Sequence, residues 1–347
     1  MRLWGLVALC MALAGCTLQP VRVSPFYGAI RSIQHPFVTI HDHGDQCGPA
    51  ALAGVLRVLG SPVSADDLRN SMYMPARSGT LGIEMTATAR RRGMLVLPVE
   101  HQQQGLVQAL RQGATPILLV NLSLPWVPRW HYVVVTGVDP LHQQWQVQVG
   151  RGHDPEYWSD RVLGHVWHRS GYWAISVFHP KHLPHDLALD DALDAALALE
   201  RVRPEQAAAV YEQLMAAHPD DPRLPDLLAN ALREAGRKRE AGYWYRLQVV
   251  RFAKQWQGWN DWLTWLMIQG DGCQQAGRQA VHHAQIFQQQ ADAGVLRATL
   301  HSWRHHCGHD DAVPAAGSVW RGVQPKMVVT EHNVEPLHSS REEPGLP

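Results

Sequence analysis

The pattern of apolar residues changes once along this chain, at the segment His179-Pro180-Lys181-His182-Leu183-Pro184. Before this segment, short β-branched runs alternate with stretches of helical periodicity, whereas strand patterns cease after it. A chain of 347 residues is long enough for two domains. The sequence therefore predicts an α+β domain over residues 34–180 and an all-α domain over residues 185–309.

The first domain is expected to contain a mostly antiparallel sheet. Ser64 and Asp67 form the pattern of a capping box, which predicts a short helix ending at Met74. Further helices are predicted over residues 81–92 and 104–112. Five apolar runs predict the strands, which span residues 94–99, 116–122, 132–138, 145–149 and 172–178.

Cys47 lies where another helix is predicted to begin. Pro49 fits a first helical turn, which tolerates a missing N–H, and Gly60-Ser61-Pro62 ends the helix. Apolar residues recur at helical spacing between these points, namely Ala50, Ala51, Val55, Leu56 and Leu59. The N–H groups and the positive dipole end of a helix N-terminus favour a thiolate, and a nearby imidazolium lowers the thiol pKa further. Cys47 is therefore a candidate nucleophile.

His131 supplies an imidazole at the start of a predicted strand. This strand ends in the turn Asp139-Pro140-Leu141-His142-Gln143, and a second strand follows at once. If Val138 faces Trp145 in this hairpin, His131 lies opposite Gly152. A residue that orients the imidazole is therefore expected near Gly152.

Two acidic residues are candidates for that orienting role. Asp154 is the carboxylate nearest to Gly152 in the sequence. Asp139 lies eight residues along the strand from His131, about 27 Å away at ~3.4 Å per residue, and is too distant. The predicted hairpin therefore favours Asp154 as the residue that orients the His131 imidazole.

The segments around Cys47 and His131 resemble the papain-like cysteine peptidases of the bacteriocin-processing, double-glycine-leader class and their stand-alone bacterial relatives. The segments that carry the resemblance are Asp45-Gln46-Cys47-Gly48-Pro49-Ala50-Ala51-Leu52, Trp130-His131-Tyr132-Val133-Val134-Val135-Thr136-Gly137 and the preceding strand Pro116-Ile117-Leu118-Leu119-Val120. The resemblance covers roughly residues 34–178 and implies a papain-like fold. It also implies hydrolysis of an amide through a thioester, with Cys47 as nucleophile, His131 as general base and no cofactor.

The chain departs from this family pattern at two places. The family has a glutamine about half a dozen residues before the cysteine, which donates to the oxyanion, whereas this stretch reads His41-Asp42-His43-Gly44-Asp45. Gln46 or His41 would then have to donate a hydrogen bond to the oxyanion, together with the backbone N–H of Cys47. Losing one such donor typically lowers the reaction rate by a factor of about 10²–10³. The family places its third catalytic residue just after the strand, where this chain has Gly150-Arg151, so Asp154 serves only if the loop folds back.

Alternatives to a working peptidase stay open on the sequence. A cysteine in a helix of small residues is commonly a small buried hydrophobe, and a histidine at a strand start is commonly structural. The same fold could then be an inactive scaffold that binds protein through its helical domain. Thiol chemistry could also transfer an acyl group to an amine. Family members fused to exporters cut leaders after paired glycines, but this chain has neither a transporter segment nor a nucleotide-binding motif, so that substrate does not carry over.

The N-terminus predicts export. An apolar stretch over residues 3–13 is too short to span a membrane and ends in Leu13-Ala14-Gly15-Cys16, which resembles a bacterial lipoprotein signal. That resemblance implies a signal peptide over residues 1–15, a diacylglycerol on Cys16 and a tether over residues 16–33. Thr17 replaces the aspartate that favours retention in the inner membrane, so the periplasmic face of the outer membrane is expected. The alternative is a plain secretory signal with an incidental cysteine.

The charges and the cysteines limit the partners and the redox state. The chain carries 31 basic and 31 acidic residues and no net charge, so a nucleic-acid partner is not expected. Of the five cysteines, Cys10 leaves with the signal, Cys16 would be acylated and Cys47 would keep its thiol. Cys273 and Cys307 are therefore expected to form a disulfide in an oxidising compartment.

The second domain is predicted to contain helical repeats. Tyr211 recurs as Tyr245 and Ala207 as Ala241, both at a spacing of 34 residues, which is the period of tetratricopeptide repeats. About two units are recognisable, and the later helices with Trp256, Trp259, Trp262 and Trp265 are expected to cap them. Such repeats commonly bind a protein partner, and the alternative is an unspecific helical bundle. Residues 310–347 carry prolines and charges without periodicity and are expected to be disordered.

Histidine clusters raise the possibility of a metal site. One cluster is His41-Asp42-His43, and the other contains His301, His305, His306, Cys307 and His309. Neither has a full ligand set at familiar spacing, so no metal is expected.

Overall fold

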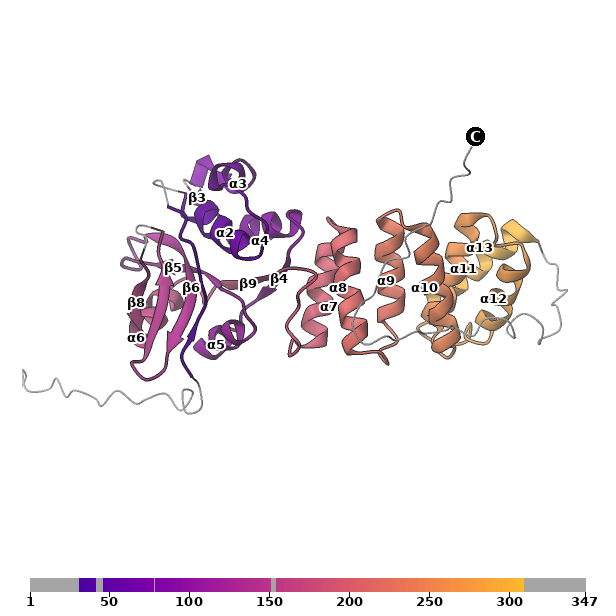
Figure 1. Cartoon of the computed structure of the whole chain (residues 1–347). Helices are drawn as coiled ribbons and strands as arrows, with labels where there is room; N and C mark the ends of the chain where they lie inside the picture. Colours follow the sequence, from indigo (N-terminus) through magenta and orange to yellow (C-terminus); the bar gives the residue numbers. More distant parts are fainter. Residues whose placement is uncertain (1–30, 42–45, 78, 151–153, 309–347) are drawn as a thin grey trace, which may run out of the picture. The chain divides into compact units, whose positions relative to one another are not determined.

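The computed structural model describes residues 31–41, 46–77, 79–150 and 154–308 (Figure 1). The predicted signal peptide, the lipidation candidate Cys16, most of the tether and the predicted tail lie outside these residues. The chain divides into two compact units, of which the first ends at Trp265 and the second begins at Leu266. None of the helices within the described ranges has the length and the apolar composition needed to cross a bilayer.

One antiparallel sheet of seven strands forms the centre of the described part of the first unit. Its order is β4-β9-β5-β6-β7-β8, and β1 pairs with β6 at Gly137 and Val138. The strands are β1 (Ile33–Gln34), β4 (Leu95–Pro98), β5 (Ile117–Asn121), β6 (Trp130–Asp139), β7 (Gln144–Gln148), β8 (Glu156–Ser159) and β9 (Ala174–Phe178). The five predicted strands are confirmed, whereas β1 and β8 were not predicted.

Helices cover both faces of this sheet because neighbouring residues of a strand point to opposite sides. The helices are α2 (Cys47–Val58), α3 (Ala65–Met72) and α4 (Gly82–Arg91) on one face, and α5 (Gln103–Arg111) and α6 (Asp160–His168) on the other. Tyr132 and Val134 of β6 pack in the core with α2, whereas Val133 and Val135 pack in the core with α5 and α6. Figure 1 shows α2, α3 and α4 grouped together beside the sheet.

The short helix α3 begins as predicted and ends earlier. Ser64 Oγ accepts a hydrogen bond from the N–H of Asp67 at 3.0 Å, so the predicted cap is confirmed. The helix stops at Met72 rather than at Met74, because Tyr73 and Met74 form a small antiparallel ladder with Gly79 and Thr80. These residues are the strands β2 (Tyr73–Met74) and β3 (Gly79–Thr80).

In the part of the chain that the structure describes, up to residue 308, only helices follow β9. They are α7 (Leu189–Glu200), α8 (Pro204–Ala217), α9 (Leu224–Glu234), α10 (Lys238–Arg251), α11 (Trp256–Gln269), α12 (Gln275–Gln285) and α13 (Gly294–Cys307). The two tyrosines at a spacing of 34 residues occupy matching positions. Tyr211 donates to Glu200 Oε2 at 2.9 Å, and Tyr245 donates to Asn230 Oδ1 at 2.7 Å, so each ties its own helix to the preceding one.

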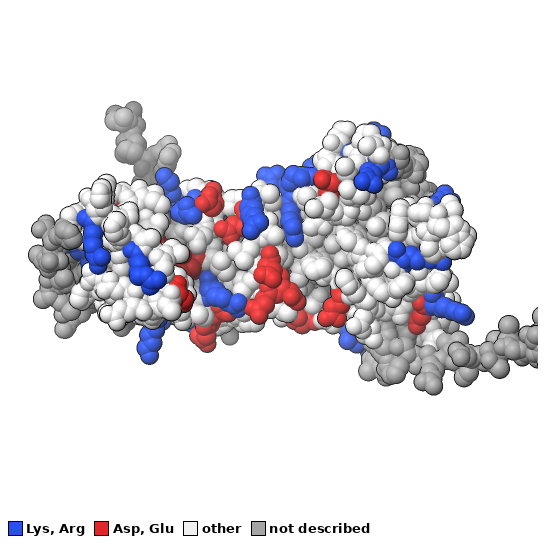
Figure 2. Space-filling view, turned by 180° about the vertical axis from the view of Figure 1, so that it is seen from behind, with Lys and Arg blue, Asp and Glu red and all other residues white. Residues whose placement is uncertain are grey.

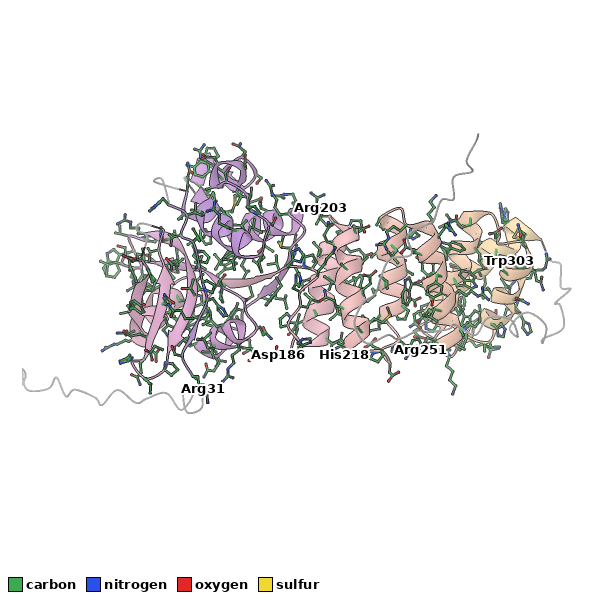
Figure 3. All side chains as sticks on the ribbon, viewed as in Figure 1. Arg31, Asp186, Arg203, His218, Arg251 and Trp303 are labelled. Atoms are coloured by element: carbon green, nitrogen blue, oxygen red, sulfur yellow. A yellow bond between two sulfur atoms is a disulfide. The ribbon has the colours of Figure 1, made fainter. Side chains whose placement is uncertain are left out.

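The sheet and the first of these helices share one hydrophobic core within the first unit. Leu95 and Leu97 of β4 belong to the same buried cluster as Ala192 and Leu199 of α7. Polar bonds connect the same regions, since Arg203 Nε donates to the Arg91 carbonyl at 2.7 Å and Gln108 Nε2 donates to Asp186 Oδ2 at 2.6 Å (Figure 3). The domain boundaries drawn from the sequence thus stay predictions, since the compact units divide at another point, within α11.

Charged residues of both signs are interspersed over the face of the molecule seen in Figure 2. This mixing agrees with the equal numbers of acidic and basic residues in the chain. Most ion pairs of the described residues are exposed, as between Arg237 and Glu240 at 2.6 Å, and such pairs contribute little to stability.

A disulfide joins Cys273 to Cys307 in the second unit, with a Cα–Cα distance of 5.2 Å. It closes a loop over a sequence separation of 34 residues and links the turn before α12 to the end of α13. Trp303 of α13 donates to the Gly272 carbonyl at 2.7 Å, beside this bond (Figure 3).

Removing the disulfide is expected to lower the stability of these last helices. Replacement of Cys273 and Cys307 by serine should lower the free energy of unfolding by about 3–4 kcal/mol, because the unfolded chain regains the entropy of a loop of this length. Urea unfolding followed by circular dichroism would measure the change. The Cys47→Ser variant is the matched control, and equal unfolding curves for the double variant and the control would contradict the prediction.

Candidate active site

The N-terminus of α2 places Cys47 beside β6 and the end of β7. Gln46 is the N-cap residue, and Cys47 is the first residue of the helix and is partly buried. A Cβ atom on Gly48 would come within 2.8 Å of Thr80 Cβ, so the helix approaches β3 closely because residue 48 is a glycine. Cys47 therefore combines partial exposure with the electrostatic field of a helix N-terminus.

His131 is the second residue of β6 and is 5% exposed. Its Nε2 atom lies 2.7 Å from the carbonyl oxygen of Val149. Since a carbonyl oxygen only accepts hydrogen bonds, Nε2 carries a proton in this contact. In the neutral ring, Nδ1 is then the basic nitrogen, which is the state that a general base requires.

Val149 connects His131 with Cys47. A cavity of about 10 Å³ is lined by Cys47 from α2, by Tyr132 and Val134 from β6, and by Gln148, Val149 and Gly150 from the end of β7. The residue that binds the imidazole thus also borders the cavity of the thiol. The structure brings the two predicted catalytic residues to the same end of the β6–β7 pair.

Tyr132 is a neutral hydrogen-bond donor in this site. Burial raises the pKa of its hydroxyl, and the neighbouring Cys47 raises it further. The hydroxyl donates to the Thr80 carbonyl at 3.1 Å, and the ring lies edge-on to Trp173 at 5.6 Å between centroids. Tyr132 therefore supports the wall of the cavity and does not compete for the proton of the thiol.

The predicted register of the hairpin is correct near the turn and is shifted by one residue at Val134 and Val135. Val138 pairs with Trp145 as predicted, but an irregularity between Val135 and Gly137 shifts the ladder, so that Val134 pairs with Gln148. Gly152, the predicted neighbour of His131, lies outside the described residues.

Asp154, the predicted orienting residue, is exposed and precedes the edge strand β8. In the β7–β8 ladder, Glu156 pairs with Val147, which places Asp154 beyond β7 as seen from β6. The hydrogen bond described for the His131 ring goes to the Val149 carbonyl. A main-chain oxygen therefore binds the ring at Nε2, and no sequence pattern could indicate it because any residue type supplies a carbonyl.

The two predicted oxyanion donors do not line the cavity. Gln46 caps no N–H of α2 with its side chain, and both Gln46 and His41 are partly exposed. Thr39 and Gln148 are polar residues that line the cavity instead. The Thr39 Oγ1 atom donates a hydrogen bond to Gln148 Oε1 at 2.5 Å. The alternation Gln144-Trp145-Gln146-Val147-Gln148 was the available sequence signal, because it puts glutamines on one face of a strand.

A loop with exposed apolar side chains leads directly into His131. Asn121 is buried, and its Oδ1 atom accepts hydrogen bonds from the N–H groups of Ser123 and Arg129 at 3.0 and 2.9 Å. Arg169 donates to the carbonyls of Asn121 and Ser123. The exposed apolar residues of this hairpin are Leu124, Trp126, Val127 and Trp130. Hydrogen bonds therefore anchor both ends of this loop, and its exposed residues form an apolar surface.

The predicted histidine clusters bring no metal site together within the described ranges. No group of three or more His, Cys, Asp or Glu side chains there is arranged to hold a metal ion. Asp42, His43 and His309 lie outside these ranges.

Comparisons with known proteins extend the description of the first domain. The model of the peptidase C39 family matches residues 36–150, about a third of the chain. No curated protein sequence matches the chain significantly.

Several solved structures are similar to parts of the chain. The peptidase domain of Streptococcus ComA, a bi-functional ABC transporter involved in quorum sensing, is 19% identical, covers 42% of this chain and 98% of its own length, and has a TM-score of 0.32. A double glycine motif protease from an AMS/PCAT transporter, in complex with its leader peptide, is 15% identical, with 43% and 96% covered and a TM-score of 0.33. The Sgt2 TPR domain from Aspergillus fumigatus is 17% identical, with 39% and 90% covered and a TM-score of 0.31.

Proposed function

Because residues 36–150 form a peptidase C39 domain, we propose that the protein is a cysteine peptidase that uses Cys47 and His131 to hydrolyse peptide bonds. The observation that carries this proposal is the position of Val149, which binds the His131 ring and borders the Cys47 cavity. A thiol at a helix N-terminus beside an imidazole whose Nε2 donates to a carbonyl, which leaves Nδ1 to take the proton, is the arrangement that such chemistry requires.

The reaction follows from these groups. His131 Nδ1 takes the proton of the Cys47 thiol, and the thiolate attacks the carbonyl carbon of the peptide, which places negative charge on the oxygen. The C–N bond breaks as the imidazolium gives its proton to the leaving amine, and a thioester remains. Water then attacks the thioester, its proton passes to His131, and the carboxylic acid leaves as the protonated thiol is restored. The hydrogen bond to Val149 keeps the ring oriented throughout.

The substrate of this proposal is a peptide with apolar side chains next to the cleaved bond. The support is the loop before His131, which is held by Asn121 and Arg169 and on which Trp126 is 75% exposed. Exposed aromatic side chains on a rigid loop are typical of binding surfaces.

Trp126→Ser is expected to raise KM for an apolar peptide several-fold and to leave kcat within about twofold, because the loop contributes to binding and not to the chemistry. Steady-state kinetics would measure both constants. The control is Tyr243→Ser, which removes another exposed aromatic ring, from α10, and should change neither constant. An unchanged KM for Trp126→Ser would contradict the role of the loop.

We further propose that the protein is exported and anchored by a lipid on Cys16 at the periplasmic face of the outer membrane. The support is the apolar stretch that ends in Leu13-Ala14-Gly15-Cys16. Mass spectrometry of the N-terminal peptide would test it. A diacylglyceryl-modified Cys16 is expected, and an unmodified N-terminus created at another position would contradict the proposal.

For the helical region we propose a tetratricopeptide-like array that binds a protein partner. The 34-residue spacing of Tyr211 and Tyr245, and their matching bonds to the preceding helices, support the repeat. An inactive scaffold that acts through these helices is the second candidate function, favoured by the lack of a glutamine in residues 41–45.

The pH dependence of Cys47 alkylation by iodoacetamide separates the two candidates. For the peptidase, we expect a thiolate well below the ordinary thiol pKa of about 8.5, and we expect His131→Ala to return the reactivity to ordinary values. Cys273 and Cys307 have no free thiol because they form a disulfide, and Cys47→Ser controls for the labelling of any other cysteine. An unreactive thiol, or one that does not respond to His131→Ala, would favour the scaffold.

A further inference from the structure

Gln148 is a buried polar residue of the Cys47 cavity to which the mechanism above assigns no role. It ends β7, is 7% exposed and pairs with Val134, whose side chain also lines this cavity. The next residue, Val149, holds the His131 ring through its carbonyl. Two consecutive residues at the end of one strand therefore reach the thiol side and the imidazole side of the site.

The amide of Gln148 is fixed at one end and available at the other. Thr39 Oγ1 donates to Gln148 Oε1 at 2.5 Å, which directs the acceptor half of the amide toward the segment before Cys47. Among the described residues, Gln148 Nε2 has no hydrogen-bond partner, and it does not belong to their fully buried polar atoms. The donor half of the amide is therefore accessible beside the nucleophile, where it can bind an acceptor that arrives with the substrate.

We propose that Gln148 Nε2 is the side-chain donor of the oxyanion hole, which it forms together with the backbone N–H of Cys47. This inference rests on the peptidase function proposed above. As the Cys47 sulfur bonds to the carbonyl carbon, the oxygen gains negative charge, and a preorganised amide N–H stabilises that charge without reorganisation. Residues 41–45 contain no glutamine, and neither Gln46 nor His41 lines the cavity, whereas Gln148 reaches it from another strand.

The size of the cavity fits a single oxyanion oxygen of the substrate. Its volume of about 10 Å³ is close to the space that one water molecule needs, so a single oxygen atom fits beside Gln148 and Cys47. Phe37 and Ile40 close the other side, which lowers the local polarity and strengthens a hydrogen bond to a charged oxygen.

The test uses the full chain and the peptide aldehyde N-acetyl-Leu-Leu-norleucinal. Cys47 adds to the aldehyde to give a hemithioacetal, whose oxygen occupies the oxyanion position. The affinity of the aldehyde therefore measures how well the oxyanion hole stabilises this oxygen, without catalytic turnover. Gln148→Met keeps the length of the side chain and removes both donors. Gln146→Met is the matched control, since Gln146 lies two residues earlier on the same face of β7 and is 8% exposed.

For Gln148→Met we expect aldehyde affinity and kcat to fall by about 10²–10³, with KM and the rate of Cys47 alkylation unchanged. Thr39→Val removes the hydrogen bond that holds the Gln148 amide and should cause a smaller loss of aldehyde affinity and kcat. This variant provides the test if Gln148→Met fails to fold. Wild-type affinity in both variants, or an equal loss in Gln146→Met, would overturn the role of Gln148 while alkylation still reports an assembled Cys47–His131 pair. If the wild type neither binds the aldehyde nor has a reactive thiolate, the peptidase function fails and this inference fails with it.

Discussion

Replacing Cys47 by serine should reduce peptide hydrolysis by at least about four orders of magnitude while the fold persists. The helix N-terminus and the His131 ring assist ionisation of a thiol with an ordinary pKa near 8.5, but they cannot produce an alkoxide from a hydroxyl group at neutral pH. The change replaces one atom at a partly buried position, so α2 should keep its packing. Measured kcat/KM, together with an unchanged circular dichroism spectrum, would establish the result.

Asp154→Asn should have a much smaller effect on peptide hydrolysis than Cys47→Ser. Because Asp154 is exposed and the Val149 carbonyl binds the His131 ring, we expect kcat to change by no more than a few-fold. A decrease near 10⁴, as is typical when an orienting carboxylate is removed, would show that Asp154 reaches the ring during catalysis. Residual activity in Cys47→Ser close to that of the wild type would remove the thiol mechanism altogether.

The second large effect concerns stability and comes from Asp226 in α9. Asp226 is 8% exposed, and its Oδ1 atom is buried without a hydrogen-bond partner among the described residues. Burial raises the pKa of its carboxyl group to about 8, and the neighbouring Asp261 contributes to the shift. The pKa of Asp261 is also raised, chiefly by burial, although Asn260, Asn230 and Arg233 oppose that shift.

Unfolding should therefore become easier as the pH rises. The folded state holds a proton on Asp226 that the unfolded state, with its pKa near 3.8, releases, so the stability contribution is complete below pH 3.8 and is lost as the pH rises through about 8. At about 1.4 kcal/mol for each unit of pKa, the shift from 3.8 to about 8 corresponds to a total loss of roughly 6 kcal/mol. Asp226→Asn, which is neutral at every pH, should remove this dependence and stabilise the protein at pH 8–9.

Urea unfolding at pH 5 and pH 8.5 would measure the difference between the wild type and Asp226→Asn, so that the other titrating groups cancel. Asp220→Asn is the control, because Asp220 lies on an exposed ion pair with Arg251 and carries no comparable burial. The expectation is a gap between wild type and Asp226→Asn that widens with pH. Parallel pH profiles for the two proteins would contradict it.

The sequence predicted those parts of the fold whose signals are local. The starts of the helices α8 and α9 have such local signals, because each helix has a proline in its first turn and a regular apolar stripe. Cys47 was identified by its position before Pro49, and His131 by its position before a β-branched run. In all these cases the neighbours in the chain determine the structure.

The remaining parts depend on contacts between distant segments. The strand β1 has two residues and exists because β6 offers it a pairing edge, and the shift of register between Val135 and Gly137 has no local signal. The alternation of residues 144–148 puts Gln148 on one face of a strand, but its hydrogen bond with Thr39, 109 positions away in the sequence, follows only from the folded chain. Sequence patterns identify strands and helices, but the partners of a side chain follow from the assembled sheet.

The single hydrophobic core that β4 shares with α7 bears on how deletion experiments should be interpreted. A fragment that stops after β9 would uncover Leu95 and Leu97 and would leave the β4 edge, which α7 contacts, open to other chains. Such a fragment is expected to aggregate, so a truncation phenotype would report lost soluble protein and not the loss of a partner-binding function. Point substitutions on the exposed faces of the helices are therefore the suitable genetic approach to that function.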